Sequence, residues 1–119
     1  MPLRMLLPLA LVASTAAAAE LPLERIRLPE GFTISVYAEG VENARQMALG
    51  ANGTLFVGSR SAGNVYALVD EDGDQRADKG FVVDSDLRMP TGLAFRDGAL
   101  YVGAISHILR YDDIEAQLD

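Results

Sequence analysis

The residues with the clearest chemical pattern are the carboxylates of one acidic stretch, residues 70–78. Counted from Asp70, the acids Asp70, Asp72, Asp74 and Asp78 occupy positions 1, 3, 5 and 9. Loops of the EF-hand type wrap Ca²⁺ in hard oxygen ligands at this spacing. The pattern predicts a calcium-binding loop, to which the backbone carbonyl of Arg76, at position 7, adds a further oxygen.

Two positions of this loop depart from the EF-hand pattern. Gln75 stands at position 6, where the turn glycine is expected, and Phe81 stands at position 12, where a bidentate Glu is expected. With fewer charged ligands, we expect a dissociation constant of about 10⁻⁴–10⁻³ M. The alternative interpretation is a long hairpin turn whose Asp and Gly residues stabilise local bends and stay solvated. Repulsion among the acids favours the cation, and the missing twelfth-position ligand favours the solvated turn.

Other candidates for chemistry are few. His107 is the one histidine, and histidine is a natural general base near neutral pH. No Ser or Asp spacing makes it a triad member, so we expect a turn residue at the start of a strand. Arg45 and Arg88 precede the first strands of two similar units, where they either bind an anion or are solvated surface residues. The chain has no Cys and no phosphate loop, dinucleotide fingerprint or nucleophile elbow, so we assign no catalytic residue.

The elements that position these residues form an internal repeat. The sequence Gly-Thr-Leu-Phe-Val-Gly at residues 53–58 returns as Gly-Ala-Leu-Tyr-Val-Gly at residues 98–103, 45 residues later. Upstream, residues 47–53 align with residues 92–98 without a gap, and downstream residues 65–68 align with residues 108–111 after a slip of two. A period of about 40–50 residues built from short strands is typical of propeller blades.

Alternation of side chains and turn residues predicts the strands. The first unit contains strands at residues 45–50, 54–58, 65–69 and 81–84, and the second contains strands at residues 91–95, 99–103 and 108–111. Asn-Gly and Asp-Gly form the first turn of each unit. A further strand is expected at residues 32–38, and a short helical turn capped by Asp112 and Asp113 is expected to run to Leu118. The predicted fold class is all-β, with about two antiparallel four-stranded propeller blades.

The start of the chain has the plan of a secretory signal. Residues 1–19 comprise one basic residue, an apolar run and a small-residue site at residues 17–19 before Glu20. The alternative, a membrane anchor, is disfavoured because the run is shorter than the roughly 20 residues that span a bilayer. The prediction is therefore a cleaved signal peptide, a periplasmic or secreted protein, and no membrane span after cleavage. Seventeen acidic against ten basic residues leave no basic patch for nucleic acid.

The sequence after the signal resembles the sorbosone dehydrogenase-like proteins. The similar segments are residues 23–32, 47–58, 65–70, 89–98 and 108–115, in this order, and they cover essentially everything after the signal. The resemblance implies a periplasmic six-bladed β-propeller of the glucose/sorbosone dehydrogenase superfamily, of which residues 20–119 would be the N-terminal portion. Members resemble soluble quinoproteins, in which pyrroloquinoline quinone (PQQ) accepts the hydride from a sugar or aldehyde, calcium polarises the quinone, and a histidine takes the substrate proton.

The resemblance transfers no catalytic or cofactor residue, because no position here matches a catalytic motif of the family. Three hypotheses follow. The chain is the N-terminal part of a sugar or aldehyde dehydrogenase and is inactive alone; it is a non-catalytic propeller binding module with a calcium loop; or it is a truncated product that does not fold alone. Two blades leave apolar faces and strand edges open, which is why the third hypothesis is considered.

Overall fold

A computed structural model describes residues 20–119, and the predicted signal peptide, residues 1–19, lies outside the described residues. The chain divides into two compact units, of which one ends at Ile34 and the other comprises Ser35–Asp119. In the described part of the first unit, one short 3₁₀ helix, η1, spans Leu23–Arg25. In the part of the chain that the structure describes, no helix is long and apolar enough to cross a membrane.

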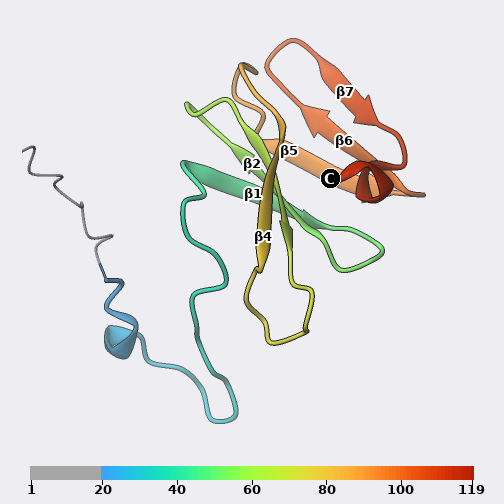
Figure 1. Ribbon diagram of the computed structural model, residues 1–119. Coiled ribbons are helices and arrows are strands. Elements are labelled where there is room, and N and C mark those ends of the chain that lie inside the picture. The colour runs from blue at the N-terminus through green and yellow to red at the C-terminus, as the bar shows by residue number, and fades with distance from the viewer. Residues whose placement is uncertain (1–19) are drawn as a thin grey trace, which may run out of the picture. The chain divides into compact units, whose positions relative to one another are not determined.

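The second unit is built from two antiparallel sheets (Figure 1). Sheet A has the strand order β1-β2-β3-β4, and sheet B has the order β5-β6-β7, so each strand pairs with its neighbour in sequence. The strands are β1 (Ala44–Leu49), β2 (Leu55–Ser59), β3 (Val65–Val69), β4 (Lys79–Asp84), β5 (Gly92–Arg96), β6 (Ala99–Gly103) and β7 (Ile108–Tyr111). The all-β prediction and the seven strands of the two units are confirmed, with ends that differ by at most two residues.

The strand predicted at residues 32–38 is wrong, since none of these residues enters a ladder. The segment has β-branched, alternating side chains, but a strand also needs the edge of a partner strand. Instead, Tyr37 and Ala38 pack on the side chains of sheet A around Val57, and the Tyr37 carbonyl accepts one hydrogen bond from the Ala77 N–H at 2.8 Å. We call residues 37–41 the covering segment, because they lie across a sheet face and do not extend the sheet.

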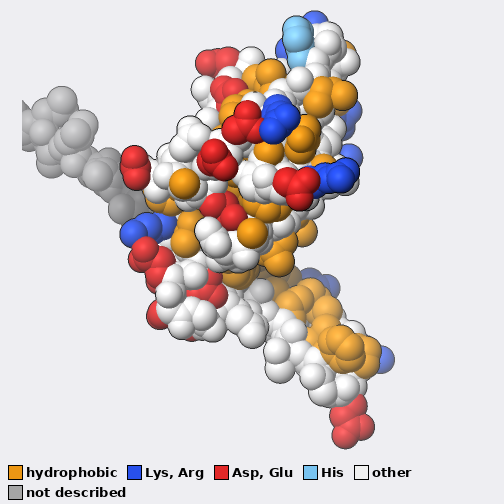
Figure 2. Space-filling view, turned by 90° about the vertical axis from the view of Figure 1, so that its right-hand side faces the viewer, with side chains coloured by type: hydrophobic (Ala, Val, Ile, Leu, Met, Phe, Trp, Pro, Cys, Tyr) orange, Lys and Arg blue, Asp and Glu red, His pale blue; other side chains and the backbone are white. Residues whose placement is uncertain are grey.

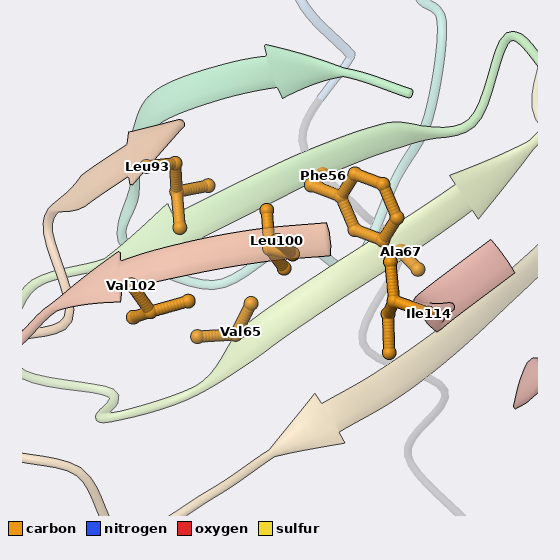
Figure 3. Packing of buried hydrophobic residues seen from close by; sticks show 7 residues of the cluster. All are labelled: Phe56, Val65, Ala67, Leu93, Leu100, Val102 and Ile114. Atoms are coloured by element: carbon orange, nitrogen blue, oxygen red, sulfur yellow. The ribbon is translucent and has the colours of Figure 1, made fainter. Parts of the chain in front are cut away.

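The main core lies between the two sheets (Figure 3). Phe56, Leu100 and Val102 are completely buried there, and Phe56 stacks on Phe95 with ring centroids 5.9 Å apart. Burial of one such side chain stabilises a fold by roughly 1.5–3 kcal/mol. The full cluster also contains Val65, Ala67, Leu93 and Ile114. A smaller cluster on the opposite face of sheet A contains Val57, Tyr66 and Leu68 under the covering segment.

The registers of the two sheets correct one part of the predicted repeat. In β2 and β6, Phe56 corresponds to Tyr101, as predicted, but Phe56 pairs with Ala48 while Tyr101 pairs with Ala94. Residues 47–49 therefore correspond to residues 93–95, one position later than the ungapped alignment. The reason is turn length: the first hairpin turns through residues 50–54, and the second turns through Asp97 and Gly98 alone. The two-residue slip downstream is confirmed, because the Gly58–Val65 pair corresponds to the Gly103–Ile108 pair.

A 3₁₀ helix, η2 (Ile114–Gln117), follows β7, as the predicted helical turn requires. Its N-cap residue Asp113 is in the left-handed conformation and makes no side-chain capping bond. The helix instead ties the two sheets together: Ile114 enters the main core, and both carboxylate oxygens of Glu115 accept the Asn52 N–H, at 3.0 and 3.2 Å. The C-terminal helix thus fixes the first turn of sheet A.

Candidate metal centre

The acidic loop joins β3 to β4 and is closed at its base by backbone bonds. Asp78 N–H donates to the Val69 carbonyl at 2.8 Å, and Ala77 N–H donates to the Tyr37 carbonyl of the covering segment. Both contacts use backbone groups and leave the Asp78 side chain available. The loop is therefore anchored to sheet A on one side and to the covering segment on the other.

Inside the loop, the carboxylates order the backbone. Asp70 accepts the N–H groups of Gly73 at 2.7 Å and Gln75 at 2.9 Å, one on each oxygen. Asp78 accepts the Glu71 N–H at 2.7 Å. Carboxylates that hold local N–H groups in this way fold the chain around themselves, which brings their remaining lone pairs to one place.

The structure brings together three of the four predicted ligands. One carboxylate oxygen from each of Asp70, Asp72 and Asp78 lies within 4.8 Å of the others. Calcium binds oxygen at 2.3–2.6 Å, so oxygens on opposite sides of one ion lie about 5 Å apart, and the three fit one cation. Asp74 is not part of this group, and its Oδ1 accepts the Arg76 N–H at 2.8 Å.

The two departures from the EF-hand pattern have different structural outcomes. Gln75 has φ of +67° and so adopts the left-handed turn that glycine normally supplies at position 6. Phe81 lies in β4, where it pairs with Ala67 and packs against the main core. The loop thus keeps the sharp turn without the glycine. At the twelfth position, the Phe81 side chain packs against the core and supplies no oxygen ligand.

The positively charged side chain of Lys79 lies beside the loop. Its Nζ lies 2.5 Å from Glu71 Oε1, and the two side chains are about half exposed. The hydrogen bond to Glu71, followed by the charge of that carboxylate, raises the pKa of Lys79. Glu71 is thereby engaged outside the three-carboxylate group, which leaves Asp70, Asp72 and Asp78 as the candidate ligands.

The loop also acts electrostatically on the covering segment. Burial, followed by the charges of Asp70 and Asp78, raises the pKa of Tyr37. The same segment is tied to the loop by the backbone hydrogen bond from Ala77 N–H to the Tyr37 carbonyl. The sequence contains no short-range signal for this contact, because Tyr37 precedes the loop by 33 residues.

The other candidates are separated in space. His107 is exposed, with Nδ1 2.8 Å from Ser106 Oγ, as expected for a turn residue. His107 and Arg88 line a pocket of about 320 Å³, and Arg45 lines a different, open hollow of about 500 Å³ with Gln46 and Thr91. Figure 2 shows the histidine at the surface and acidic side chains interspersed with exposed apolar ones. Arg45 and Arg88 do not form a common anion site.

One contact between the two sheets was missed by sequence reasoning. Gln46 Oε1 accepts the Leu93 N–H at 3.0 Å, across the junction of the two sheets. The ladder between β1 and β2 shifts between Ala44 and Met47, and such bulges re-aim side chains. No spacing in the sequence marks this bulge.

Comparisons with known proteins provide no further identification. No protein-family model matches the sequence, and a search of curated proteins gives no significant match.

Proposed function

We propose that residues 20–119 form the N-terminal blades of a periplasmic or secreted β-propeller that resembles the sorbosone dehydrogenase-like quinoproteins. The observation that supports this most directly is the pair of successive antiparallel sheets, stacked face to face, whose strands repeat with matching registers. Meanders stacked in this way are the unit of propeller architecture. The proposed role of these residues is to provide the scaffold of a sugar or aldehyde dehydrogenase.

The described residues do not fit PQQ as ligands, and we assign none of them to it. The quinone carries several carboxylates, which call for a cluster of basic side chains. The two candidate arginines lie in separate hollows, and Asp86 shares the pocket of Arg88. Catalysis in the proposed dehydrogenase therefore falls to residues other than these.

The second part of the proposal is that the acidic loop binds calcium through Asp70, Asp72 and Asp78. Each of the three side chains keeps lone pairs that its hydrogen bonds to the backbone do not use, and the Arg76 carbonyl and water complete the shell that calcium requires. With three carboxylates and no bidentate Glu, we expect the weak affinity of extracellular modules, about 10⁻⁴–10⁻³ M. This loop also supports the alternative function, a non-catalytic propeller module that binds calcium.

Isothermal titration with calcium tests the loop. Asp72→Asn should reduce the affinity at least about tenfold, because a charged ligand is lost while the amide oxygen can still accept the Asp74 N–H, now seen at 3.1 Å. Asp74→Asn is the matched control, since Asp74 lies outside the three-carboxylate group, and it should leave the affinity nearly unchanged. Absence of heat at millimolar calcium in the unmodified chain would end the calcium proposal.

Reduction of a dye acceptor tests the scaffold role. The chain is incubated with PQQ, calcium and a panel of sugars and aldehydes. We expect no turnover, because these residues provide no catalytic base for the substrate and no basic cluster for the quinone. Measurable turnover would show that residues 20–119 contain the active site and would contradict their assignment as scaffold.

A further inference from the structure

The turn between β1 and β2 contains the dipeptide Asn52-Gly53, which has a chemistry of its own. The side-chain amide of an asparagine can be attacked by the backbone nitrogen of the next residue, and a side chain on that next residue hinders the attack. Of the three asparagines in the sequence, Asn43 precedes an alanine and Asn64 precedes a valine. Asn52 alone precedes a glycine, whose lack of a Cβ atom permits the close approach.

The structure leaves this dipeptide open to the reaction. Both residues are exposed to water, and a Cβ atom added at Gly53 would meet no other atom within 4 Å. The Gly53 N–H donates only a long hydrogen bond, at 3.3 Å, to the Gly50 carbonyl. Within residues 20–119, the Asn52 side-chain amide makes no hydrogen bond, since the contacts of this residue use its backbone N–H. Neither the attacking nitrogen nor the amide carbon is therefore shielded by packing.

The other two asparagines are held in place. Asn43 Oδ1 accepts a hydrogen bond from the Ser61 hydroxyl, and Asn64 Nδ2 donates to the Tyr66 hydroxyl at 3.1 Å. The residue after Asn64, Val65, is completely buried in β3. These contacts oppose the side-chain and backbone rotations that the attack requires, so the same reaction is disfavoured at both positions.

We propose that Asn52 is a site of spontaneous deamidation, restrained by Glu115 of η2. The Gly53 nitrogen bonds to Asn52 Cγ, the bond from Cγ to Nδ2 breaks, and ammonia leaves with the proton of the Gly53 nitrogen. The product is a five-membered succinimide. Water then opens one of its two C–N bonds, which gives aspartate or isoaspartate at residue 52. No oxidation or reduction takes place, and water is the only co-reactant.

The restraint comes from the contact between the turn and the C-terminal helix. Both carboxylate oxygens of Glu115 accept the Asn52 N–H, at 3.0 and 3.2 Å. When the Gly53 nitrogen loses its proton, negative charge develops one peptide unit away from this carboxylate, and the two charges repel. The hydrogen bonds also hold the backbone that must rotate for the ring to close. Glu115 therefore slows the reaction.

The reaction in turn weakens the contact that restrains it. The new carboxylate at residue 52 lies only a few bonds from the N–H that Glu115 holds, so the two charges are within a Debye length of about 8 Å. Isoaspartate also adds a methylene to the backbone of a tight turn. Deamidation is thus an irreversible change that loosens η2 from the first turn of sheet A.

Peptide mapping by mass spectrometry measures the reaction in the full chain, incubated at mildly alkaline pH and sampled over time. Asn52 should convert at least about tenfold faster than Asn43 or Asn64, because its attacking nitrogen is unhindered. Glu115→Gln should accelerate the conversion further. Glu39→Gln is the matched control, since it removes one charge from an exposed glutamate of the covering segment, and the rate should stay unchanged. Equal rates at the three asparagines, or no acceleration by Glu115→Gln, would overturn the proposal.

The consequence is measured on Asn52→Asp, which reproduces one product. Its melting temperature should be lower than that of the unmodified chain by about 2–6 °C, because the contact with Glu115 is weakened. In the Glu115→Gln background the same change should lower the melting temperature less, since no second carboxylate faces the new charge. Equal losses in the two backgrounds would contradict the coupling to η2. These outcomes are independent of the calcium and dehydrogenase tests.

Discussion

The junction between the two sheets rests on a close contact that one substitution can probe. A Cβ atom added at Gly58 would lie 2.3 Å from the Pro90 carbonyl oxygen, where the connection between β4 and β5 crosses β2. Gly103 holds the corresponding position in sheet B, and a Cβ there would have its nearest neighbours in Gly92 at 3.8 Å. The two glycines thus hold equivalent positions in the repeat, but only Gly58 has the segment around Pro90 packed against it.

The expected changes in the free energy of unfolding have opposite signs for the two substitutions. Neither glycine has positive φ, so alanine at either site restricts the unfolded chain and by itself stabilises by about 0.4–1 kcal/mol. At Gly58, the overlap with Pro90 forces a backbone shift of the kind that costs about 1–3 kcal/mol or more. We expect Gly58→Ala to destabilise by about 1–3 kcal/mol, and Gly103→Ala to be neutral or slightly stabilising.

Urea and thermal unfolding of both variants measure the difference. Because about 1 kcal/mol shifts the midpoint of a domain of this size by about 4–8 °C, the two variants should melt at least several degrees apart, with unchanged m-values. Equal melting temperatures would refute the close approach of the connecting segment to β2, and with it the packing of the two sheets described above.

Substitutions at three further positions test local features. Gln75→Gly places glycine at a φ of +67° and should raise the free energy of unfolding, measured in urea, by up to about 1 kcal/mol. The same variant should bind calcium more tightly in titration calorimetry. Tyr111→Phe removes the hydrogen bond to Asp84 and should cost about 1 kcal/mol at neutral pH. Burial and this bond raise the pKa of Tyr111 above its unfolded value of about 10, so the unmodified chain loses stability as pH rises above about 10, and thermal melts of the Phe variant should lose less. Glu115→Ala removes both acceptors of the Asn52 N–H and should cost about 0.5–1.5 kcal/mol in urea unfolding, and Glu115→Gln should cost less because one acceptor remains.

The strands of the two sheets were predictable because their sequence signals are local. Alternating apolar residues and the Asn-Gly and Asp-Gly turns specify β2, β3, β6 and β7 almost to the residue. Residues 32–38 have the same local signals but form no strand, because strand formation also depends on a free partner edge that the sequence does not display. The one-residue shift in the repeat arose in the same way, since turn length, and not sequence similarity, sets the register of a hairpin.

The location of the candidate metal centre was predictable from the sequence, but the set of residues that form it was not. Spacing alone proposed four ligands, and the folded loop brings together Asp70, Asp72 and Asp78. Asp74 lies outside this group, although it and Asp72 make the same local bond to the backbone N–H two residues ahead, so membership depends on the path of the folded loop and not on spacing. The link between the loop and Tyr37 was beyond sequence reasoning, since it depends on how the covering segment crosses sheet A.

The face of sheet A that carries Phe56 and the face of sheet B that carries Tyr101 hold the same positions of the repeat but differ in chemistry. Where sheet A has the buried Phe56 and Ala67, sheet B has Tyr101 and Arg110. The Arg110 guanidinium carbon lies 5.6 Å from the centre of the Tyr101 ring and its Nη2 lies 2.6 Å from Asp112 Oδ1, so a charged group covers the aromatic surface. In sheet B the phenol and the guanidinium keep contact with water while their apolar parts pack together. The repeat is therefore apolar where its two sheets pack on each other and amphipathic on the face of sheet B that carries Tyr101 and Arg110.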